Sequence, residues 1–539
     1  MNTKLTKKII LEAIRIKVQT RDEFLALAKR LSSAIKTTPP AISALRAAYL
    51  NLTSKRQIRQ STFLDRILQK RAVRTLSGVA IITVLTKPFP CPGQCVYCPT
   101  EARMPKSYLS NEPAAARALR LKFNPYRQVA ERIKALEANG HLTDKIELIV
   151  KGGTWSAYPW KYQKWFIKRC FEACNLINRG LTSAAGATRG PTSRHLSQAQ
   201  KKNEKARHRV IGLTLETRPD WITPQEILRL RELGCTRVEL GVQHTDDKIL
   251  DKIKRGHTLE QVKQATKFLK DAGFKVDYHL MPMLPGSTPA RDFLMFKKVF
   301  TDPDLKPDMI KIYPCAVIKN SALYAWWRKG FYKPYSGKKL LELLIKVKSQ
   351  LIPRYCRISR LIRDIPSTSI EAGSKVTNLR EVIQAEMKER GLKCKCLRCR
   401  EIGHQPHVTC NIKHVTLKLF IDKYKASGGT EYFLSIENPK REIVYAFCRL
   451  RLPNKQIKHL DSVALLRELH TYGHLMSLHQ RQRAAAQHIG LGQRLMQKAE
   501  EIARKANYKK MAVISGIGVR EYYKKLGYRL EDTYMVKSL

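Results

Sequence analysis

The segment Cys91-Pro-Gly-Gln-Cys95-Val-Tyr-Cys98 places three cysteines in C-x3-C-x2-C spacing on a short stretch of chain. Thiolates are soft ligands that suit iron–sulfur clusters, and three of them leave one iron of a 4Fe–4S cube without a protein ligand. That iron can bind a small molecule. A structural zinc site is the alternative, although zinc usually takes four ligands and a C-x2-C pair.

The cysteine segment follows the first of six segments that read as strands. These segments are rich in β-branched residues and alternate with amphipathic helical stretches, a pattern typical of an α/β fold with a parallel sheet, open or curled into a partial (β/α)6 barrel. The strands are predicted at residues 79–86, 146–150, 210–216, 237–243, 275–281 and 309–313. Sites in such folds lie at the carboxyl ends of the strands, where the cysteine segment, Gly152-Gly153-Thr154 and Glu216-Thr-Arg218 all fall.

The composition indicates a folded protein that binds polyanions. The chain has 539 residues, with 101 Lys+Arg against 45 Asp+Glu and a formal charge of +56. A positive field of this size attracts nucleic acid. The 43% hydrophobic content argues against a disordered basic tail. Thirteen cysteines are too few for a disulfide scaffold, and no apolar run is long enough to span a bilayer, so we expect a cytoplasmic protein without a membrane partner.

The basic charge is strongest at the N-terminus. The first 80 residues contain 17 Lys+Arg and 4 Asp+Glu, and Thr37-Thr-Pro-Pro40 separates helices predicted at 21–34 and 41–52. We interpret residues 1–75 as a basic helical segment that binds a polyanion. A solvated helical surface is the alternative.

Three further regions follow along the chain. Residues 76–331 contain the strand–helix repeat, residues 332–410 form a basic helical connector, and residues 411–539 form a small mixed α/β domain. Within the first of these, residues 181–207 are rich in Ser, Thr, Gly and Lys without periodicity, and read as a flexible insertion that carries no chemistry.

The connector contains a second cysteine cluster, Cys394-Lys-Cys396-Leu-Arg-Cys399. We expect zinc here, as a clip between domains, with a second iron–sulfur cluster as the alternative. Three thiolates are one ligand short of a closed zinc site, so the fourth ligand is Cys315, His404 or water. Cys315 is equally well explained as an ordinary buried cysteine.

The C-terminal domain contains a glycine loop between a strand and a helix. Gln487-His-Ile-Gly490-Leu-Gly492 follows a strand predicted at 464–470 and opens a helix at 493–505. Backbone N–H groups at a helix N-terminus can bind a pyrophosphate. Tyr522-Tyr523 lies downstream of this loop.

Both halves resemble known families. The cysteine segment resembles that of the radical S-adenosylmethionine (radical SAM) family, in which the methionine end of the cofactor binds the open iron and one electron generates a 5′-deoxyadenosyl radical. This resemblance implies a 4Fe–4S cluster on Cys91, Cys95 and Cys98 and an external electron donor. It also implies S-adenosylmethionine beside Gly152, Gly153 and Thr154. The C-terminal order resembles GNAT acetyltransferases, whose Q-x-x-G-x-G/A loop cradles coenzyme A.

This domain pair resembles the catalytic subunit of Elongator and its stand-alone bacterial and archaeal relatives. Further matching segments are Arg74-Thr-Leu-Ser-Gly-Val79, Asn124-Pro-Tyr126, Glu239-Leu-Gly-Val-Gln243 and Ile514-Ser-Gly-Ile-Gly-Val-Arg520. The resemblance implies a tRNA-modifying enzyme that converts the wobble uridine (position 34) to 5-carboxymethyluridine. In the family's proposed mechanism the radical removes a hydrogen from the acetyl group of acetyl-CoA, the carbon radical attacks carbon-5 of the base, and thioester hydrolysis leaves a carboxylate.

The resemblance also assigns acetyl-CoA contacts by position. They are Lys145, Glu468, Leu469, His470, Thr471, Leu491, Gly492, Gln493 and Tyr523. Tyr523 and Lys145 are the implied catalytic residues, because a tyrosine hydroxyl can protonate a leaving thiolate and a lysine can hold the thioester or a CoA phosphate. A core aromatic and a solvated charge are the respective alternatives.

A protein-lysine acetyltransferase of the histone type is the alternative function. A surface charge of +56 would repel lysine-rich tails, and lysine acetylation leaves the three cysteines unexplained. The expected partner is a tRNA anticodon stem-loop, with the wobble base splayed out of its loop. The sequence allows a homodimer and implies no obligatory protein complex.

Overall fold

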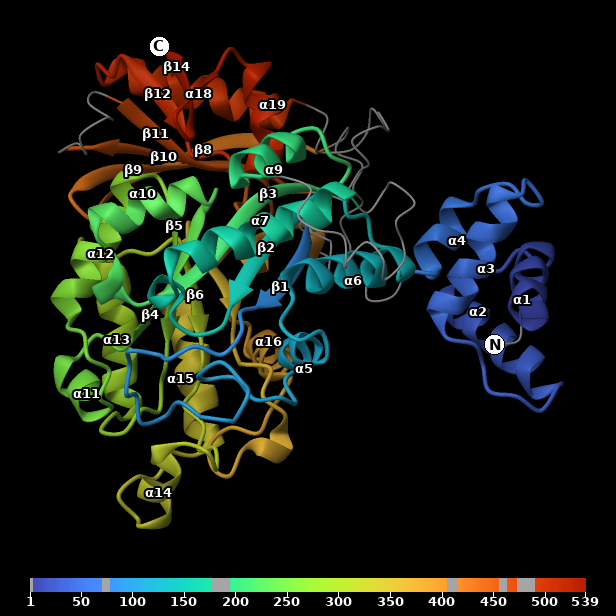
Figure 1. Cartoon of the computed structure of the whole chain (residues 1–539), viewed down its shortest axis with the longest axis horizontal. Helices are drawn as coiled ribbons and strands as arrows, with labels where there is room; N and C mark the ends of the chain where they lie inside the picture. Colours follow the sequence, from blue (N-terminus) through green and yellow to red (C-terminus); the bar gives the residue numbers. More distant parts are fainter. Residues whose placement is uncertain (1–2, 70–77, 177–193, 405–414, 455–462, 473–489) are drawn as a thin grey trace.

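A computed structural model describes the chain at residues 3–69, 78–176, 194–404, 415–454, 463–472 and 490–539. Three parts stand out in Figure 1: a group of N-terminal helices, a central body around a parallel sheet, and a C-terminal domain that caps one end of that body. In the described ranges no helix combines the length and the apolar composition needed to cross a membrane.

The central body is built on a parallel sheet whose seven strands lie in chain order. The strands are β1 (Ala80–Leu85), β2 (Lys145–Lys151), β3 (Arg209–Thr217), β4 (Arg237–Gln243), β5 (Lys275–Leu280), β6 (Met309–Ile312) and β7 (Arg357–Arg360). The α/β class and the first six strands match the prediction. The seventh strand was not predicted. It has the sequence Arg-Ile-Ser-Arg, which contains one apolar residue, and it lies inside the segment 332–410 that was interpreted as a connector.

Helices cover the outside of this sheet, as expected for strand–helix repeats. They are α5 (Pro113–Arg120), α6 (Pro125–Ala138), α7 (Trp160–Leu176), α9 (Leu196–Asn203), α10 (Pro224–Glu232), α11 (Asp247–Lys252), α12 (Leu259–Asp271), α13 (Pro289–Thr301), α14 (Ala322–Arg328), α15 (Gly337–Gln350), α16 (Leu379–Glu389) and α17 (Leu397–Arg400). Thr223, Thr258 and Thr288 accept hydrogen bonds from first-turn backbone N–H groups and so fix where α10, α12 and α13 begin.

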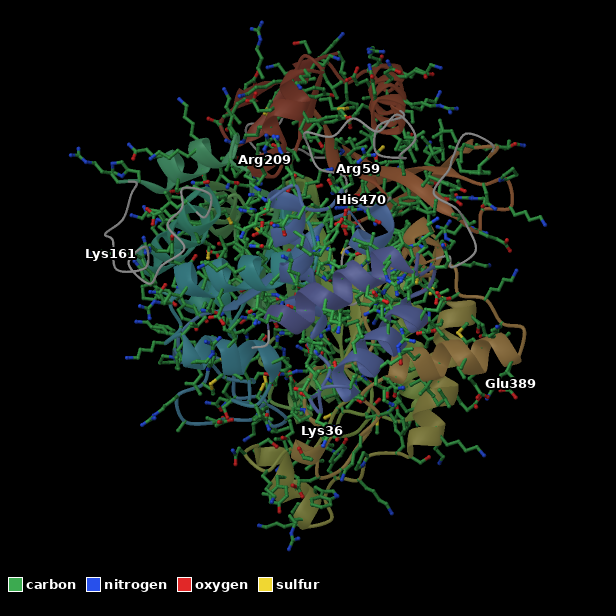
Figure 2. The ribbon with its side chains drawn as sticks, turned by 90° about the vertical axis from the view of Figure 1, so that its right-hand side faces the viewer. Lys36, Arg59, Lys161, Arg209, Glu389 and His470 are labelled. Atoms are coloured by element: carbon green, nitrogen blue, oxygen red, sulfur yellow. The ribbon has the colours of Figure 1, made fainter. Side chains whose placement is uncertain are left out.

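Four N-terminal helices form a separate packed group beside α6 (Figure 1). They are α1 (Thr3–Arg15), α2 (Arg21–Ser33), α3 (Ile42–Ser54) and α4 (Thr62–Ile67). Ile9, Phe24 and Leu45 are fully buried in a core of their own. Lys36 and Arg59, labelled in Figure 2, are exposed on this group. Its packed core leaves the basic side chains on the outside, as an anion-binding surface requires.

Part of the predicted insertion 181–207 is ordered, which corrects that prediction. Residues 181–193 lie outside the described ranges, whereas α9 follows them and buries Leu196 and Ala199. Directly after α9, Glu204 binds Arg520 and Lys524 of the C-terminal domain at 3.1 and 3.2 Å. The helix has eight residues and is mostly polar, so its sequence shows too little apolar periodicity to reveal it.

The C-terminal domain is a second seven-stranded sheet with the order β13-β14-β12-β11-β10-β9-β8. Its elements are β8 (Lys418–Ala426), β9 (Gly429–Glu437), β10 (Val444–Pro453), β11 (Val463–Thr471), α18 (Leu491–Lys505), β12 (Lys510–Val513), α19 (Arg520–Lys524), β13 (Arg529–Glu531) and β14 (Tyr534–Ser538). The strands β11 and β12 pair in parallel only over Val463–Leu466, so Arg467–Thr471 extends beyond the end of β12. This divergence leaves room for the start of α18.

Buried ion pairs join the C-terminal sheet to the amino ends of the barrel strands. Arg467 donates to Asp308 at 2.8 and 2.5 Å, and Arg451 donates to Asp271 at 2.9 Å. Arg449 lies between Glu468 at 2.8 Å and the backbone oxygen of Tyr355 at 2.8 Å. Because a buried charge is tolerated only with a partner, these pairs fix one docking geometry for the two domains.

Candidate active site

The cysteine loop lies at the carboxyl end of β1, at the end of the barrel interior away from the C-terminal domain (Figure 1). Two of its thiols lie next to Gly93, where an added Cβ would stand 3.5 Å from Cys95 Sγ and 3.7 Å from Cys91 Sγ. Cys98 follows through a tight turn, with its backbone N–H bonded to the Cys95 oxygen at 3.1 Å. Three thiols on one compact loop are the donor set that a 4Fe–4S cluster with one open iron requires.

Two arginines lie beside this loop. Arg255 donates through Nη1 to Cys95 Sγ at 3.4 Å, while its Nε donates to the Gly241 oxygen at 3.1 Å. Arg218 is held by Asp220, with Nε to Oδ1 at 2.9 Å, and its buried Nη1 has no hydrogen-bond partner among the described residues. A Cβ on Gly93 would come within 2.6 Å of that Nη1, so a side chain at position 93 would displace the Arg218 guanidinium. Both cations favour negative charge at the loop.

The Gly152-Gly153-Thr154 segment lies next to the cysteine loop, as the prediction for an S-adenosylmethionine site requires. Thr154 Oγ1 is 3.7 Å from Cys91 Sγ. Gly152 has a φ of 138°, and a Cβ there would overlap the Thr86 hydroxyl. A side chain is therefore excluded, and the backbone can approach a ligand closely.

A ring of charged side chains that the sequence did not predict lies inside the barrel, next to the cysteine loop. Lys151 pairs with Glu216 at 2.8 Å and with Glu239, and Lys311 also pairs with Glu239. His279 joins the two carboxylates, with Nε2 3.0 Å from Glu239 and Nδ1 3.4 Å from Glu216. The alternation of polar and apolar residues in a strand sequence shows only which residues share a face. It does not show that charged side chains from five adjacent strands lie close together.

These side chains line one cavity of about 650 Å³ inside the half-barrel. Burial disfavours charge on Glu216 and Glu239, but Lys151 and the other basic neighbours together outweigh it and hold the pKa of both carboxyl groups below the ordinary range. Burial also lowers the pKa of Lys311 to about 8. The wall that the cavity presents to a ligand is therefore polar and charged.

Three of the predicted acetyl-CoA residues, Leu469, Thr471 and Gly492, lie close together where β11 extends beyond the end of β12. A Cβ on Gly492, at the start of α18, would lie 3.7 Å from Thr471 Oγ1 and 3.8 Å from Leu469 Cδ2. Gly490, the N-cap, has a φ of 78°, which favours glycine. Leu491 is buried and Gln493 is exposed. Gln487, the first residue of the predicted glycine loop, lies outside the described residues.

The other predicted contacts occupy different surroundings. The Glu468 side chain is committed to Arg449 in the domain interface, and the His470 ring lies 4.4 Å from that of Tyr472. Tyr523 is buried, which raises the pKa of its hydroxyl well above the ordinary value. Lys145 begins β2, at the barrel end that faces the C-terminal domain, where burial lowers its pKa. Roles for Tyr523 and Lys145 stay predictions.

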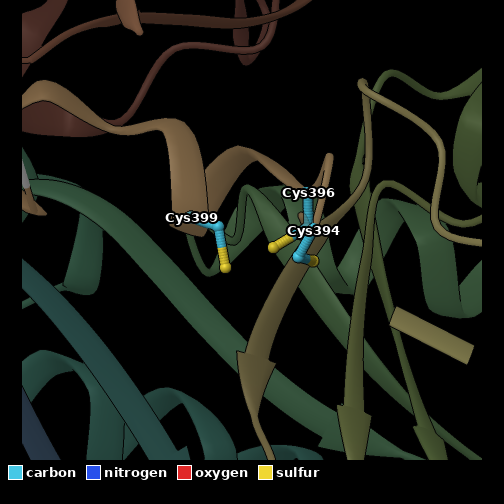
Figure 3. Close-up of side chains that lie close together, drawn as sticks. All are labelled: Cys394, Cys396 and Cys399. Carbon is cyan, nitrogen blue, oxygen red and sulfur yellow. The ribbon is translucent and has the colours of Figure 1, made fainter. Parts of the chain in front are cut away.

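The second cysteine cluster forms a compact group of thiols. The Sγ atoms of Cys394, Cys396 and Cys399 lie within 4.8 Å of one another (Figure 3). Hydrogen bonds from Cys394 and Cys399 hold the pKa of the Cys396 thiol well below its ordinary value. Such a set of soft donors suits zinc or iron. The Lys348 ammonium group lies 3.7 Å from Cys399 Sγ.

Neither predicted protein ligand completes this group. Cys315 lies apart from it, buried beside Tyr332, and His404 Nε2 lies 3.5 Å from the Glu401 carboxylate. Cys315 follows β6, and its thiol lies near Tyr332 and Asp292 of α13 rather than near the three cysteines. Within the described ranges the three cysteines are therefore the whole cluster.

Known proteins match both the sequence and this geometry. Residues 90–296 match the Radical SAM superfamily, and residues 307–389 match the Radical SAM C-terminal domain. A tRNA uridine(34) acetyltransferase of Methanocaldococcus infernus is 46% identical over 486 residues, which cover 88% of either chain. The chain belongs to the family of tRNA uridine(34) acetyltransferases and Elongator complex protein 3.

More distant family members and a solved structure agree. Human Elongator complex protein 3 is 37% identical over 487 residues, which cover 88% of this chain and 86% of the human protein. The structure of an N-terminally truncated archaeal Elp3 from Methanocaldococcus infernus superposes with a TM-score of 0.74 at 44% identity, covering 86% of this chain and all of that one. The family assignment and the radical SAM half-barrel are thereby confirmed.

Proposed function

We propose that this protein modifies the wobble uridine of tRNA, forming 5-carboxymethyluridine from acetyl-CoA. The main support for the proposal is the loop of three thiols at one end of a polar cavity in the barrel. The relatives of the chain are named tRNA uridine(34) acetyltransferases. A cluster on Cys91, Cys95 and Cys98 would supply radical chemistry from S-adenosylmethionine, with electrons from an external donor. The C-terminal domain would supply the acetyl group.

The residues around each site support a division of labour. Gly152, Gly153 and Thr154 would hold S-adenosylmethionine beside the cysteine loop. Gly490 and Gly492 expose backbone N–H groups at the start of α18 for the pyrophosphate of CoA. The exposed cations of the N-terminal helices would bind the tRNA backbone.

We also infer that Cys394, Cys396 and Cys399 bind zinc, with a fourth ligand that is water or lies outside the described residues. The cluster stands where α17 meets β7 and β10, so it would support the junction between the two domains. Metal analysis tests this: Cys394→Ser is expected to lose one zinc per chain and keep its iron. Loss of iron with retention of zinc would contradict the assignment.

A reconstitution assay tests the function. Protein reconstituted anaerobically with iron and sulfide is incubated with S-adenosylmethionine, acetyl-CoA, a reductant and unmodified tRNA, and the nucleosides are analysed by mass spectrometry. We expect 5-carboxymethyluridine from the wild type and none from Cys95→Ala. Cys170→Ala, which removes a buried thiol of α7, is the matched control and is expected to stay active. Acetylated lysine with unmodified uridine would instead establish the protein acetyltransferase alternative.

A further inference from the structure

One face of strand β2 connects the two predicted cofactor sites. Its burial alternates, with Ile146, Leu148 and Val150 buried on one side and Lys145, Glu147, Ile149 and Lys151 half-buried on the other. Glu147, Ile149 and Lys151 line the barrel cavity. At a rise of about 3.3 Å per residue, the line from Lys145 to Lys151 spans about 20 Å. One end is the predicted acetyl-CoA contact, and the other runs into Gly152 and the cysteine loop.

The end of the cavity away from the cysteine loop lies close to the C-terminal domain, although every residue that lines the cavity falls between Ile81 and His404. Arg357, which lines the cavity on β7, donates through Nε to Glu401 at 2.6 Å. The same Glu401 oxygen accepts a hydrogen bond from the Tyr472 hydroxyl at 3.3 Å. Tyr472 directly follows Thr471, and its ring contacts that of His470. Thr471 and His470 are both predicted acetyl-CoA contacts. The Arg357–Glu401 ion pair and the Tyr472 hydroxyl therefore connect the cavity wall to the segment that contains His470 and Thr471.

Three buried polar atoms in the cavity wall have no hydrogen-bond partner among the described residues. They are Nε of Arg237, Oδ1 of Asp277 and Oε1 of Glu239, on residues that are all more than nine-tenths buried. An unsatisfied buried polar atom is costly and indicates an unfilled partner position. One donor and two acceptors suit a molecule with amide groups, because an amide C=O can accept from Arg237 and amide N–H groups can donate to the carboxylates.

We propose that the lumen of the half-barrel is the passage through which the acetyl-pantetheine arm of acetyl-CoA extends from the C-terminal domain to the cysteine loop. This inference rests on the proposed function. The arm is a long, narrow chain with two amides, and the cavity of about 650 Å³ lies in the size range of small-molecule sites. Its acetyl end would then lie under Thr154 and Cys91, where S-adenosylmethionine is expected.

A variant that fills the lumen tests the route. Ile149→Trp places an indole midway along β2, between the layer of Glu147 and the layer of Lys151. Ser359→Phe fills the same lumen from β7, on the opposite wall. Leu294→Trp, on the exposed side of α13, is the matched control because Leu294 is 58% exposed.

The readout is hydrogen transfer. Reconstituted protein receives tRNA, S-adenosylmethionine, a reductant and acetyl-CoA with deuterium on the methyl group. Breaking a methyl C–D bond and forming a C–D bond at the 5′ carbon puts deuterium into 5′-deoxyadenosine. CoA binding is measured by calorimetry, and reductive cleavage of S-adenosylmethionine is measured without acetyl-CoA.

The wild type and Leu294→Trp are expected to label 5′-deoxyadenosine. Ile149→Trp is expected to lose label at least tenfold while it retains CoA binding and unlabelled cleavage. If Ile149→Trp does not fold, Ser359→Phe decides by the same criterion. Wild-type labelling in a folded lumen variant would overturn the route. Absence of label in the wild type would instead contradict the proposed function, so the two failures are distinguishable.

Discussion

Arg255 shows how single residues shape the cysteine loop. Its guanidinium is buried and held by the Gly241 oxygen, so Nη1 has little freedom except to point at Cys95 Sγ. Hydrogen bonds and positive charge at a cluster's sulfur ligands stabilise the reduced form, which carries more negative charge. Nothing in the sequence around Arg255 indicates this role, because the contact joins residues 160 positions apart.

Replacing Arg255 is therefore expected to make the cluster harder to reduce. In Arg255→Leu the midpoint potential should become more negative, on the order of a tenfold change in the ratio of reduced to oxidised cluster, or about 59 mV for one electron. Anaerobic redox titration followed by electron paramagnetic resonance measures it at equal iron content. Arg255→Lys keeps the charge and should shift the potential less. An unchanged potential in Arg255→Leu would refute the influence of this contact.

At the scale of elements, local sequence patterns predicted some strands and helices and did not predict others. The first six strands of the barrel sheet were predictable because each follows from local propensity and periodicity. The strand β7 and the helix α9 were not, since four and eight mostly polar residues carry no period and take their structure from neighbours. The same limit applied to the site. Cysteine spacing predicted both clusters as groups, whereas Arg218, Arg255 and the ring around Glu239 depend on contacts between distant strands.

Gly492 illustrates an element-level requirement at the start of α18. Valine there would crowd the Tyr522 hydroxyl, 3.0 Å from a Cβ at this position, and would fill the space next to Thr471. Gly492→Val should weaken CoA binding at least tenfold, measured by calorimetry, with little change in melting temperature. Gly337→Val, whose Cβ meets nothing within 4 Å, is the control and should bind CoA normally. Unchanged CoA affinity in Gly492→Val would place the CoA site elsewhere.

The ion pairs between β6 and β11 predict how stability depends on pH. Burial opposes ionisation of Asp308, but Arg467, Lys270 and Arg449 outweigh it and lower its pKa to about 2. Because the pKa of Asp308 is lower in the folded than in the unfolded chain, its contribution is present above about pH 4 and is lost as the pH falls toward 2. That contribution is about 2 kcal/mol of unfolding free energy.

Urea unfolding at several pH values measures this effect. In Asp308→Asn the part of the acid-induced loss of stability between about pH 4 and pH 2 that belongs to Asp308 should disappear, and the variant should be destabilised at neutral pH because Arg467 keeps its burial without a carboxylate. Asp304→Asn, at a half-exposed carboxylate nearby, should unfold like the wild type. A wild-type pH profile in Asp308→Asn would contradict this account of the interface.

At the scale of the whole molecule, the N-terminal helices with their exposed basic side chains are separate from the two sheets. The N-terminal helices keep their own core and present basic side chains beside α6, while the sheets meet through buried ion pairs. Electrostatic binding of nucleic acid should weaken steeply with salt. Replacing exposed Lys4, Lys7 and Lys8 of α1 by Gln should reduce the slope of log affinity against log salt by about 0.7 to 0.9 for every phosphate that these lysines neutralise.

Filter binding of tRNA over a range of salt concentrations measures that slope. Lys505, Lys509 and Lys510 are also exposed, between the end of α18 and the start of β12 in the C-terminal domain, and their replacement by Gln should leave the slope unchanged. An unchanged slope in the α1 variant, or equal changes in both variants, would mean that α1 is not part of the tRNA site.

The central claim is that the two domains act on one product, and isotope tracing tests it most directly. Reconstituted protein is given unmodified tRNA, S-adenosylmethionine, a reductant and acetyl-CoA with both acetyl carbons labelled by carbon-13, and the wobble nucleoside is analysed by mass spectrometry. The account predicts 5-carboxymethyluridine that carries both labelled carbons, and none from Cys95→Ala. Unmodified wobble uridine, or a modified uridine without the label, would contradict it.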